Sequence, residues 1–220
     1  MSVVTIRGQL GSGAPEIATQ VANELHAEYV DREIIAEVAA RLNREEEEVM
    51  AKETPPVRLL DRIAEALGRS CDFGDGSAGA YLPIQQIPLD DTRYLQALES
   101  VVRELAHSQS IVIRGRGSQF ILKDHPGAFH VLVVAPLEVR VKRVMESLKL
   151  DQEASKLEIA RFDDSNREFI KRYFRADLED PENYDLVINT KHISLQSASS
   201  IIVDALSIRD RTSGREETTG

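Results

Sequence analysis

The stretch that decides the fold is residues 3–18, which read VVTIRGQLGSGAPEIA. Its β-branched start predicts a short strand, its glycines predict a turn, and the residues after the turn begin a helix. Gly8, Gly11 and Gly13 allow positive φ angles and a close approach of the backbone to a ligand. Pro15 suits the first helical position, because its fixed φ matches a helix. A glycine turn that opens onto a helix N-terminus presents free N–H groups to an anion, and the expected anion is phosphate.

The spacing of this turn follows the Walker A loop, G-x-x-x-x-G-K-[ST], with Gly8 and Gly13 as its two glycines. Ala14 stands where the motif has lysine, Pro15 follows it, and Glu16 comes where nucleotide kinases often carry a hydroxyl that helps to hold Mg²⁺. The lysine normally neutralises the β- and γ-phosphates, and alanine cannot. The stretch therefore predicts a phosphate cradle without its main cation. The alternative is a glycine-rich turn without a ligand.

Composition narrows the class of protein. The chain has 220 residues, 42% of them hydrophobic, which is enough for one large domain or one domain with an insertion. Its formal net charge of −10 argues against general nucleic-acid binding but leaves room for a local basic pocket. No apolar run reaches the roughly 18 residues of a membrane span, and no signal peptide is visible. Cys71 is the only cysteine, which fits a reducing compartment and a cytoplasmic location.

Strand and helix patterns alternate along the chain, which predicts a parallel sheet covered by helices on both faces. Asp31 is expected to cap the second helix and Asn43 to end it. The acidic run 45–48 is expected to begin a further helix as a solvated face rather than as a metal site. Other strands are expected at 28–30, 110–113, 129–134 and 184–190, and other helices at 57–67, from Asp90 or Asp91 to 105, over most of 151–175, and at 193–206.

Arginines gather where ligands bind in parallel sheets, beyond the carboxyl ends of the strands. Arg114 and Arg116 stand in a glycine turn directly after a buried strand, which favours anion recognition over a merely exposed turn. Farther along, Arg140 and Arg143 are three residues apart and share a helix face. Residues 161, 164 and 167 also lie on one side of a helix, although by themselves they are typical of a salt-bridged solvent face.

Taken together, these pieces resemble the cytidylate-kinase-like family of P-loop nucleotide kinases, over residues 3–206 and in the same order. The order makes the resemblance specific, because each motif alone is weak. The matching segments are GSGAPEIA at 11–18, YVD at 29–31, VIRGRG at 112–117, APLEVRVKR at 135–143, DSNR at 164–167 and YDLVINT at 184–190.

The resemblance implies a donor site for ATP with Mg²⁺. The glycine loop would cradle the donor phosphates, and the exit of the last strand would lie beside the donor base. No side chain of the chain is assigned to the metal. The residues so implied are Gly8, Gly11, Ser12, Gly13 and Ala14 in the loop, and Asn189 and Thr190 at the strand exit.

The resemblance also implies an acceptor site and a lid. Arg116 would contact the acceptor nucleotide. Arg140, Arg143 and Arg167 would close on the transferring phosphoryl group from the lid, and Asp164 would orient those arginines or the acceptor. The partners would be a nucleotide donor and a small-molecule acceptor, with no nucleic acid or membrane and a homo-oligomer as a possibility.

The implied organisation is a single P-loop kinase-like domain over 1–208. It would include a helical acceptor-side insertion at about 43–106 and a lid region at about 140–178. Residues 68–89 are rich in glycine, serine and aspartate and predict a long mobile connection, either a loop that closes over substrate or a disordered surface loop. The polar tail at 209–220 is expected to be disordered.

Several positions depart from the family pattern. Authentic cytidylate kinases resemble it but have aspartate where this chain has Gly117, and arginines where it has Glu37 and Ala160. Three functions therefore stay open: a phosphotransferase that moves the γ-phosphate of ATP to a nucleoside monophosphate or similar acceptor, a weak or inactive nucleotide-binding regulator, and a scaffold for protein interactions.

Overall fold

The computed structural model describes residues 2–53 and 90–216, with side chains described up to residue 212. Its centre is a five-stranded sheet in the order β2-β3-β1-β4-β5, with every neighbouring pair parallel. The predicted parallel sheet is confirmed, and the carboxyl ends of all its strands lie at one edge. The strands are β1 Val3–Gly8, β2 Glu28–Val30, β3 Ile111–Arg114, β4 Ala128–Val134 and β5 Leu186–Asn189.

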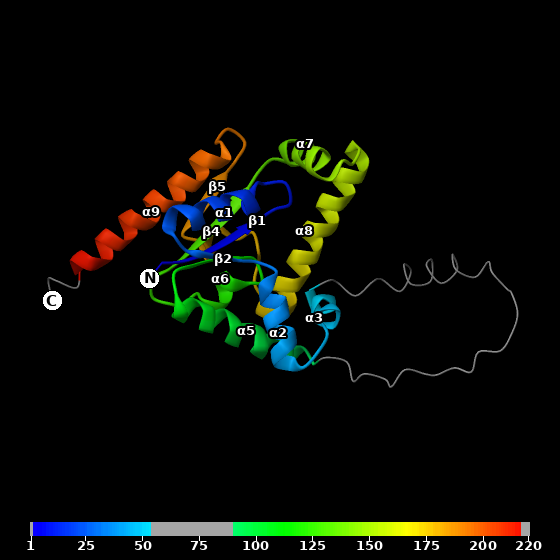
Figure 1. Cartoon of the computed structure of the whole chain (residues 1–220). Helices are drawn as coiled ribbons and strands as arrows, with labels where there is room; N and C mark the ends of the chain where they lie inside the picture. Colours follow the sequence, from blue (N-terminus) through cyan, green and yellow to red (C-terminus); the bar gives the residue numbers. More distant parts are fainter. Residues whose placement is uncertain (1, 54–89, 217–220) are drawn as a thin grey trace, which may run out of the picture.

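Helices cover this sheet on both faces, as the sequence predicts for a parallel sheet (Figure 1). They connect successive strands and also extend beyond the sheet at its carboxyl edge. The helices are α1 Ala14–Leu25, α2 Glu33–Leu42, α3 Glu46–Glu53, α5 Asp91–Ser108, α6 Ser118–Ile121, α7 Leu137–Leu148, α8 Gln152–Phe174, the 3₁₀ turn η1 Pro181–Asn183, and α9 Leu195–Glu216.

The central strand β1 is buried along its whole length, which explains its nearly continuous apolar sequence. Val4 and Ile6 belong to a core that β1 forms with α1 and α9. Val3 belongs to a second core, formed with α2, α5 and α8. Because side chains alternate along a strand, Arg7 faces the second side, where its guanidinium lies over the ring of Phe162 in α8.

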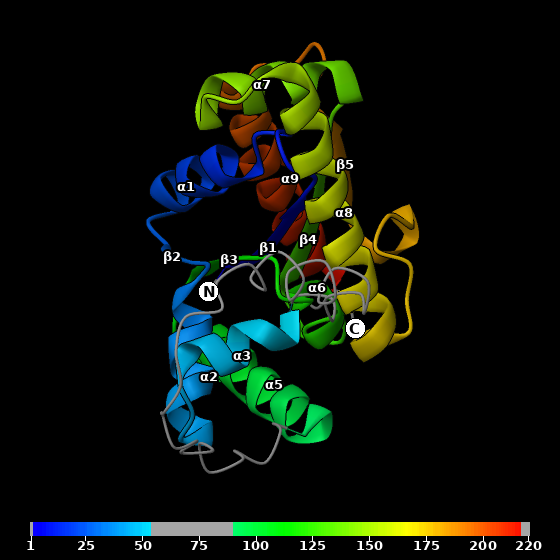
Figure 2. The same ribbon diagram turned by 90° about the vertical axis from the view of Figure 1, so that its right-hand side faces the viewer.

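Helices α7 and α8 form the helical lid that the sequence predicted. Figure 2 shows α8 running from α7 at one end toward α6 and α3 at the other. A small core of Val141, Val144 and Ile159 joins the two helices, and Leu10 of the glycine loop packs against it. The lid helices are therefore in direct contact with the loop.

The predicted helix ends are confirmed at two places and wrong at one. The Asp90 carboxylate accepts a hydrogen bond from the N–H of Arg93 and caps α5, and Asn43 ends α2 in the left-handed region at φ 50°. Asp31 does not cap α2, which begins at Glu33 after Arg32. Its carboxylate instead pairs with Arg114 from β3, an ion pair that draws it away from the helix terminus.

The expected disorder of the tail is wrong for residues 209–216, because α9 continues to Glu216, and residues 217–220 lie outside the described residues. The guanidinium of Arg209 donates to the carbonyls of Ala128 at 2.6 Å and Gly127 at 3.0 Å, and it lies 5.3 Å from the ring centre of Phe129. These contacts hold the helix against the start of β4. The expected helix at 57–67 and the expected mobile connection at 68–89 lie outside the described residues.

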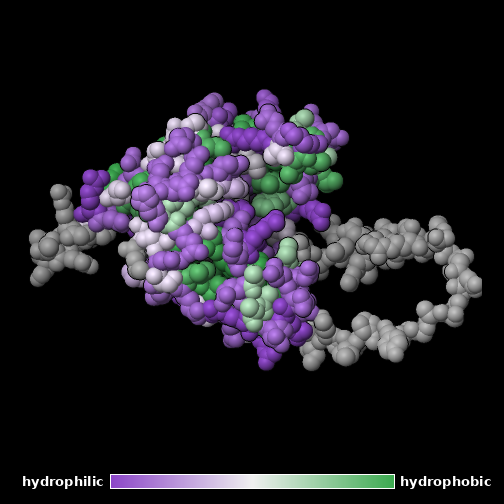
Figure 3. Space-filling view, in the orientation of Figure 1, coloured by the Kyte–Doolittle hydropathy of each residue, from purple (hydrophilic) through white to green (hydrophobic). Residues whose placement is uncertain are grey.

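The surface is consistent with the high content of charged residues. Figure 3 shows hydrophilic side chains over most of the face seen in the orientation of Figure 1, with smaller apolar patches between them. Among the helices of the described ranges, none has both the length and the apolar character that would let it cross a membrane.

Candidate active site

The glycine loop connects the end of β1 to the start of α1 at the carboxyl edge of the sheet. Gly11 and Gly13 have φ angles of 80° and 89°, in the left-handed region that favours glycine. At Gly8, an added Cβ would lie 2.2 Å from the Cβ of Ala14 and 2.7 Å from the Oγ of Ser12. Only glycine fits this first position, so the loop keeps the tight shape that the sequence predicted.

The interior of the loop offers hydrogen-bonding groups without a protein partner. Within the described part of the chain, the N–H groups of Gly11 and Gly13 donate to no backbone or side-chain acceptor. The hydroxyl of Ser12 is fully buried and likewise has no partner among the described residues. Such orphaned donors at a helix N-terminus are suited to the oxygens of a phosphate group. The residues present therefore fit the phosphates of a bound nucleotide.

Arg143 of α7 braces the loop from its outer side. Its guanidinium donates to the carbonyls of Gly11 at 3.2 Å and Ser12 at 3.0 Å. It also donates to the hydroxyl and the carbonyl of Thr190, just after β5, at 2.9 and 3.0 Å. The Thr190 hydroxyl in turn donates to the Ser12 carbonyl at 2.8 Å. The carbonyl groups of the loop are therefore bound on the outside, which leaves its N–H groups for a ligand.

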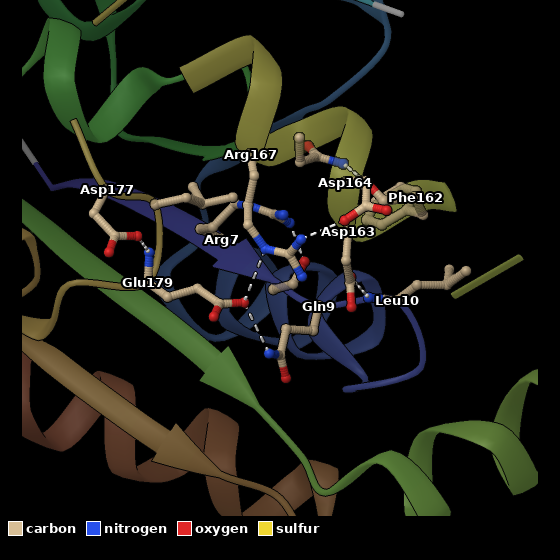
Figure 4. Close-up of polar contacts among 12 residues, drawn as sticks. Arg7, Gln9, Leu10, Phe162, Asp163, Asp164, Arg167, Asp177 and Glu179 are labelled. Atoms are coloured by element: carbon tan, nitrogen blue, oxygen red, sulfur yellow. Dashed lines mark hydrogen bonds and ion pairs between the residues drawn. The ribbon is translucent and has the colours of Figure 1, made fainter. Parts of the chain in front are cut away.

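Arg140 holds the loop to α8. It is 8% exposed, and its Nη1 lies 2.6 Å from the carboxylate of Asp163 and 3.4 Å from the carbonyl of Leu10. The other Asp163 oxygen accepts from the N–H of Leu10 at 3.5 Å. Figure 4 shows Asp163 reaching from α8 toward Leu10, while its neighbour Asp164 turns to Arg167. In this structure Arg140 and Arg143 thus support the loop rather than reach across it.

Arg167 and Asp164 form a second pair on a more open face of α8. Their side chains are 46% and 63% exposed and make an ion pair with each other. The Nε of Arg167 also lies 4.0 Å from the carboxylate of Glu179, which accepts a hydrogen bond from Gln9 of the loop at 3.2 Å (Figure 4). Within residues 2–53 and 90–212, both partners of this exposed arginine are therefore themselves exposed to solvent.

Beside the loop, a pocket of about 300 Å³ opens at the carboxyl ends of β1 and β3 and extends to α3 and α8. We call it the anion pocket, because its lining holds four arginines and two carboxylates, a balance of +2 in a chain of net charge −10. Its volume is at the small end of ligand sites. The lining residues are Arg7, Asp31, Arg32, Met50, Glu53, Arg114, Gly115, Arg116, Phe162, Ser165, Asn166 and Phe169.

Two of the pocket's arginines are held by carboxylates. The Nε of Arg114 lies 3.0 Å from Asp31; burial lowers the pKa of Arg114, but the ion pair outweighs it and the net shift is upward. Arg116 pairs with Glu53 at the end of α3, and burial lowers its pKa. The other oxygen of Glu53 accepts from the hydroxyl of Tyr94 at 3.1 Å.

Most of the site residues expected from the sequence meet around the loop. Gly8 to Ala14, Arg140, Arg143 and Thr190 form one assembly, and Arg116 lies in the adjoining pocket. Asn189 is exposed, and its side chain accepts from the N–H of Lys191 at 3.0 Å. No group of three or more metal-ligating side chains occurs in the described part of the chain, which includes the acidic run at the start of α3.

The sequence analysis missed Arg7, Glu53 and Asp163. Only Arg7 carried a usable signal. It stands directly before Gly8 in a strand that reads as buried, and charged side chains are seldom buried without a structural or functional role. The sequence carried no such signal for Glu53 or Asp163. The arginine partner of Glu53 is 63 residues away along the chain, and that of Asp163 is 23 residues away.

Comparison with known proteins points to one family. Residues 3–192 match the model of the Cytidylate kinase-like family. A cytidylate kinase from Sulfolobus acidocaldarius is 24% identical over 213 residues, covering 93% of each chain. An uncharacterised protein from Eubacterium ventriosum has the same fold, with a TM-score of 0.65 at 18% identity over 94% of this chain and 99% of that one. A gluconokinase from Sinorhizobium meliloti has a TM-score of 0.51 at 13% identity, with coverage of 98% and 97%.

Proposed function

Because the chain belongs to the cytidylate kinase-like family, we propose that it transfers the γ-phosphate of ATP to a nucleoside monophosphate or a similar small acceptor. The observation that supports this most is the glycine loop, which keeps the shape and the free N–H groups of a phosphate cradle without the Walker lysine. We place the reaction in the cytoplasm, where ATP and nucleoside monophosphates are available.

In this proposal the loop binds the donor phosphates and the anion pocket binds the acceptor. Mg²⁺ bound with ATP supplies charge neutralisation on the phosphates. Phosphoryl transfer depends mainly on positioning and on stabilising the charge of the transferring group. Gly11, Ser12 and Gly13 supply fixed donors, Arg143 keeps them in place, and Arg167 is the exposed cation beside the loop that would contact the phosphoryl group.

A catalytically weak, nucleotide-binding regulator is the second candidate, and two contacts favour it. Arg116, the residue that would contact the acceptor, is engaged by the carboxylate of Glu53. Glu37, which stands where authentic cytidylate kinases carry a phosphate-binding arginine, pairs with Arg41 at 3.1 Å. Both features reduce the positive charge available to an acceptor.

The test begins with calorimetric titration of ATP, with and without Mg²⁺, followed by measurement of ADP release with CMP, dCMP, UMP, AMP and GMP. Micromolar binding with turnover of any acceptor supports the kinase, and binding without turnover supports the regulator. No binding at millimolar ATP contradicts both the kinase and the regulator, and leaves the third function, a scaffold for protein interactions.

A matched pair of glycine variants shows whether the loop is the binding site. In Gly11→Ala the new Cβ would lie 2.7 Å from the Arg140 carbonyl, at a φ of 80°. In Gly127→Ala the φ is 95°, but an added Cβ meets nothing within 4 Å, so backbone strain is the only cost. We expect ATP affinity to fall at least tenfold in the first variant and to stay within about threefold in the second.

A further inference from the structure

Arg7 is a buried cation that no carboxylate in residues 2–53 or 90–212 neutralises at contact distance. It is 7% exposed and directly precedes Gly8, the first glycine of the loop. The carboxylates of Asp163 and Glu179 stabilise the charged form of Arg7 from beyond 4.0 Å, but each of them already interacts with another arginine. Asp163 lies 2.6 Å from Arg140, and Glu179 lies 4.0 Å from Arg167.

This sets Arg7 apart from the other arginines of the anion pocket. Arg114 is paired with Asp31 and Arg116 with Glu53, while Arg32 is exposed to solvent. A charge that is buried without a partner lowers the stability of a protein unless something compensates it. Unpaired buried charges persist mainly where they bind a ligand, because selection for that function then retains them despite their cost in stability.

Local contacts position the guanidinium of Arg7 but occupy few of its N–H donors. One nitrogen donates to the carbonyl of Gly8, and the group lies 5.8 Å from the ring centre of Phe162. A guanidinium has five N–H donors, so most of them remain for a ligand in the pocket. Burial lowers the pKa of Arg7 to about 10, so the side chain is still charged at neutral pH.

We propose that Arg7 binds the phosphate group of the acceptor at the floor of the anion pocket. The proposal rests on the phosphotransferase function argued above. The planar guanidinium matches two phosphate oxygens at once. Its position next to Gly8 also supplies a positive charge beside the loop, where Ala14 supplies none.

The experiment compares the full chain with Arg7→Met, Arg7→Lys and Arg140→Met. Stability is measured by urea unfolding without ligand, and binding is measured as the response to inorganic phosphate and to CMP. Methionine replaces the unbranched stem of the arginine as far as Nε but carries no charge. We expect Arg7→Met to be as stable as the wild type or more stable, and to bind both probes about 10- to 100-fold more weakly, as expected for loss of charge-assisted hydrogen bonds. Arg7→Lys should bind with intermediate affinity, because it keeps the charge but loses the two-point contact.

Arg140→Met is the matched comparison, since it removes a buried arginine that does have a carboxylate partner and should therefore be clearly less stable. The proposal is overturned if Arg7→Met binds phosphate as the wild type does, if the wild type does not respond to phosphate, or if Arg7→Met loses stability as Arg140→Met does. ATP titration and the ADP-release assay of the wild type, done separately, decide the proposed function: ATP binding and turnover with no effect of the Arg7 variants leave the kinase standing without this inference.

Discussion

The ion pair between Arg140 and Asp163 allows a quantitative prediction about how the loop is held. Both side chains are almost completely buried, at 9% and 6% exposure, and their atoms are 2.6 Å apart. Replacing Arg140 by methionine leaves Asp163 with one long hydrogen bond, from the Leu10 N–H at 3.5 Å. Removing one partner of a buried pair costs about 3–5 kcal/mol of unfolding free energy. For a domain of this size that corresponds to a fall in Tm of about 6–20 °C.

The measurement is urea and thermal unfolding of Arg140→Met, Asp163→Leu and the double variant. The double variant removes both charges, so it should recover more than half of the loss, because a well-packed apolar pair often replaces a buried ion pair at little cost. Exposed Arg167 and Asp164 provide the matched control, since Arg167→Met should change stability by less than about 1 kcal/mol. A loss below about 1 kcal/mol in Arg140→Met would refute the view that this pair fixes the loop to α8.

Two further predictions concern stability away from the loop. Burial lowers the pKa of His130 below its ordinary value, so the unfolded chain takes up a proton at a higher pH than the native chain does. His130 therefore contributes stability that is complete above about pH 6.5 and lost as the pH falls further, and His130→Gln should show a flatter profile between about pH 7 and pH 5 in urea titrations. Arg209→Ala removes two hydrogen bonds to carbonyls and should cost about 1–3 kcal/mol. Exposed Arg211, among the described residues, donates only to the Ser207 carbonyl of its own helix, so Arg211→Ala should cost less than about 0.5 kcal/mol. Equal losses in the two arginine variants would contradict the role given to Arg209.

The sequence was sufficient for the architecture because the signals that define it are local. The β-branched strand, the glycines of residues 8–13 and the helix after them follow one another directly, and β3, β4 and β5 read as short, mainly apolar runs. The motifs also predicted that Arg143 and Thr190 would belong to the site, although not that both would bind the outer side of the loop.

The detailed chemistry of the site could not be read in the same way, because it depends on which charges meet across long separations in sequence. Asp31 fitted a helix cap by local rules, but an arginine 83 residues away binds it instead. The end of α9 shows the same effect, since its polar sequence gives no hint that Arg209 reaches carbonyls 81 and 82 residues earlier.

The packing of Ala14 has a consequence for any attempt to restore the lysine of the Walker A motif. Its methyl group is 1% exposed and lies within the core that β1 forms with α1 and α9. A lysine at this position needs a path for four further atoms, and a closely packed surrounding resists such an insertion by about 1–3 kcal/mol. Introducing the Walker lysine at position 14 is therefore not a neutral change, because neighbouring residues must first make room. A loop rebuilt by Ala14→Lys alone would carry this packing cost, so positive charge is supplied to the loop more readily by residues outside the core.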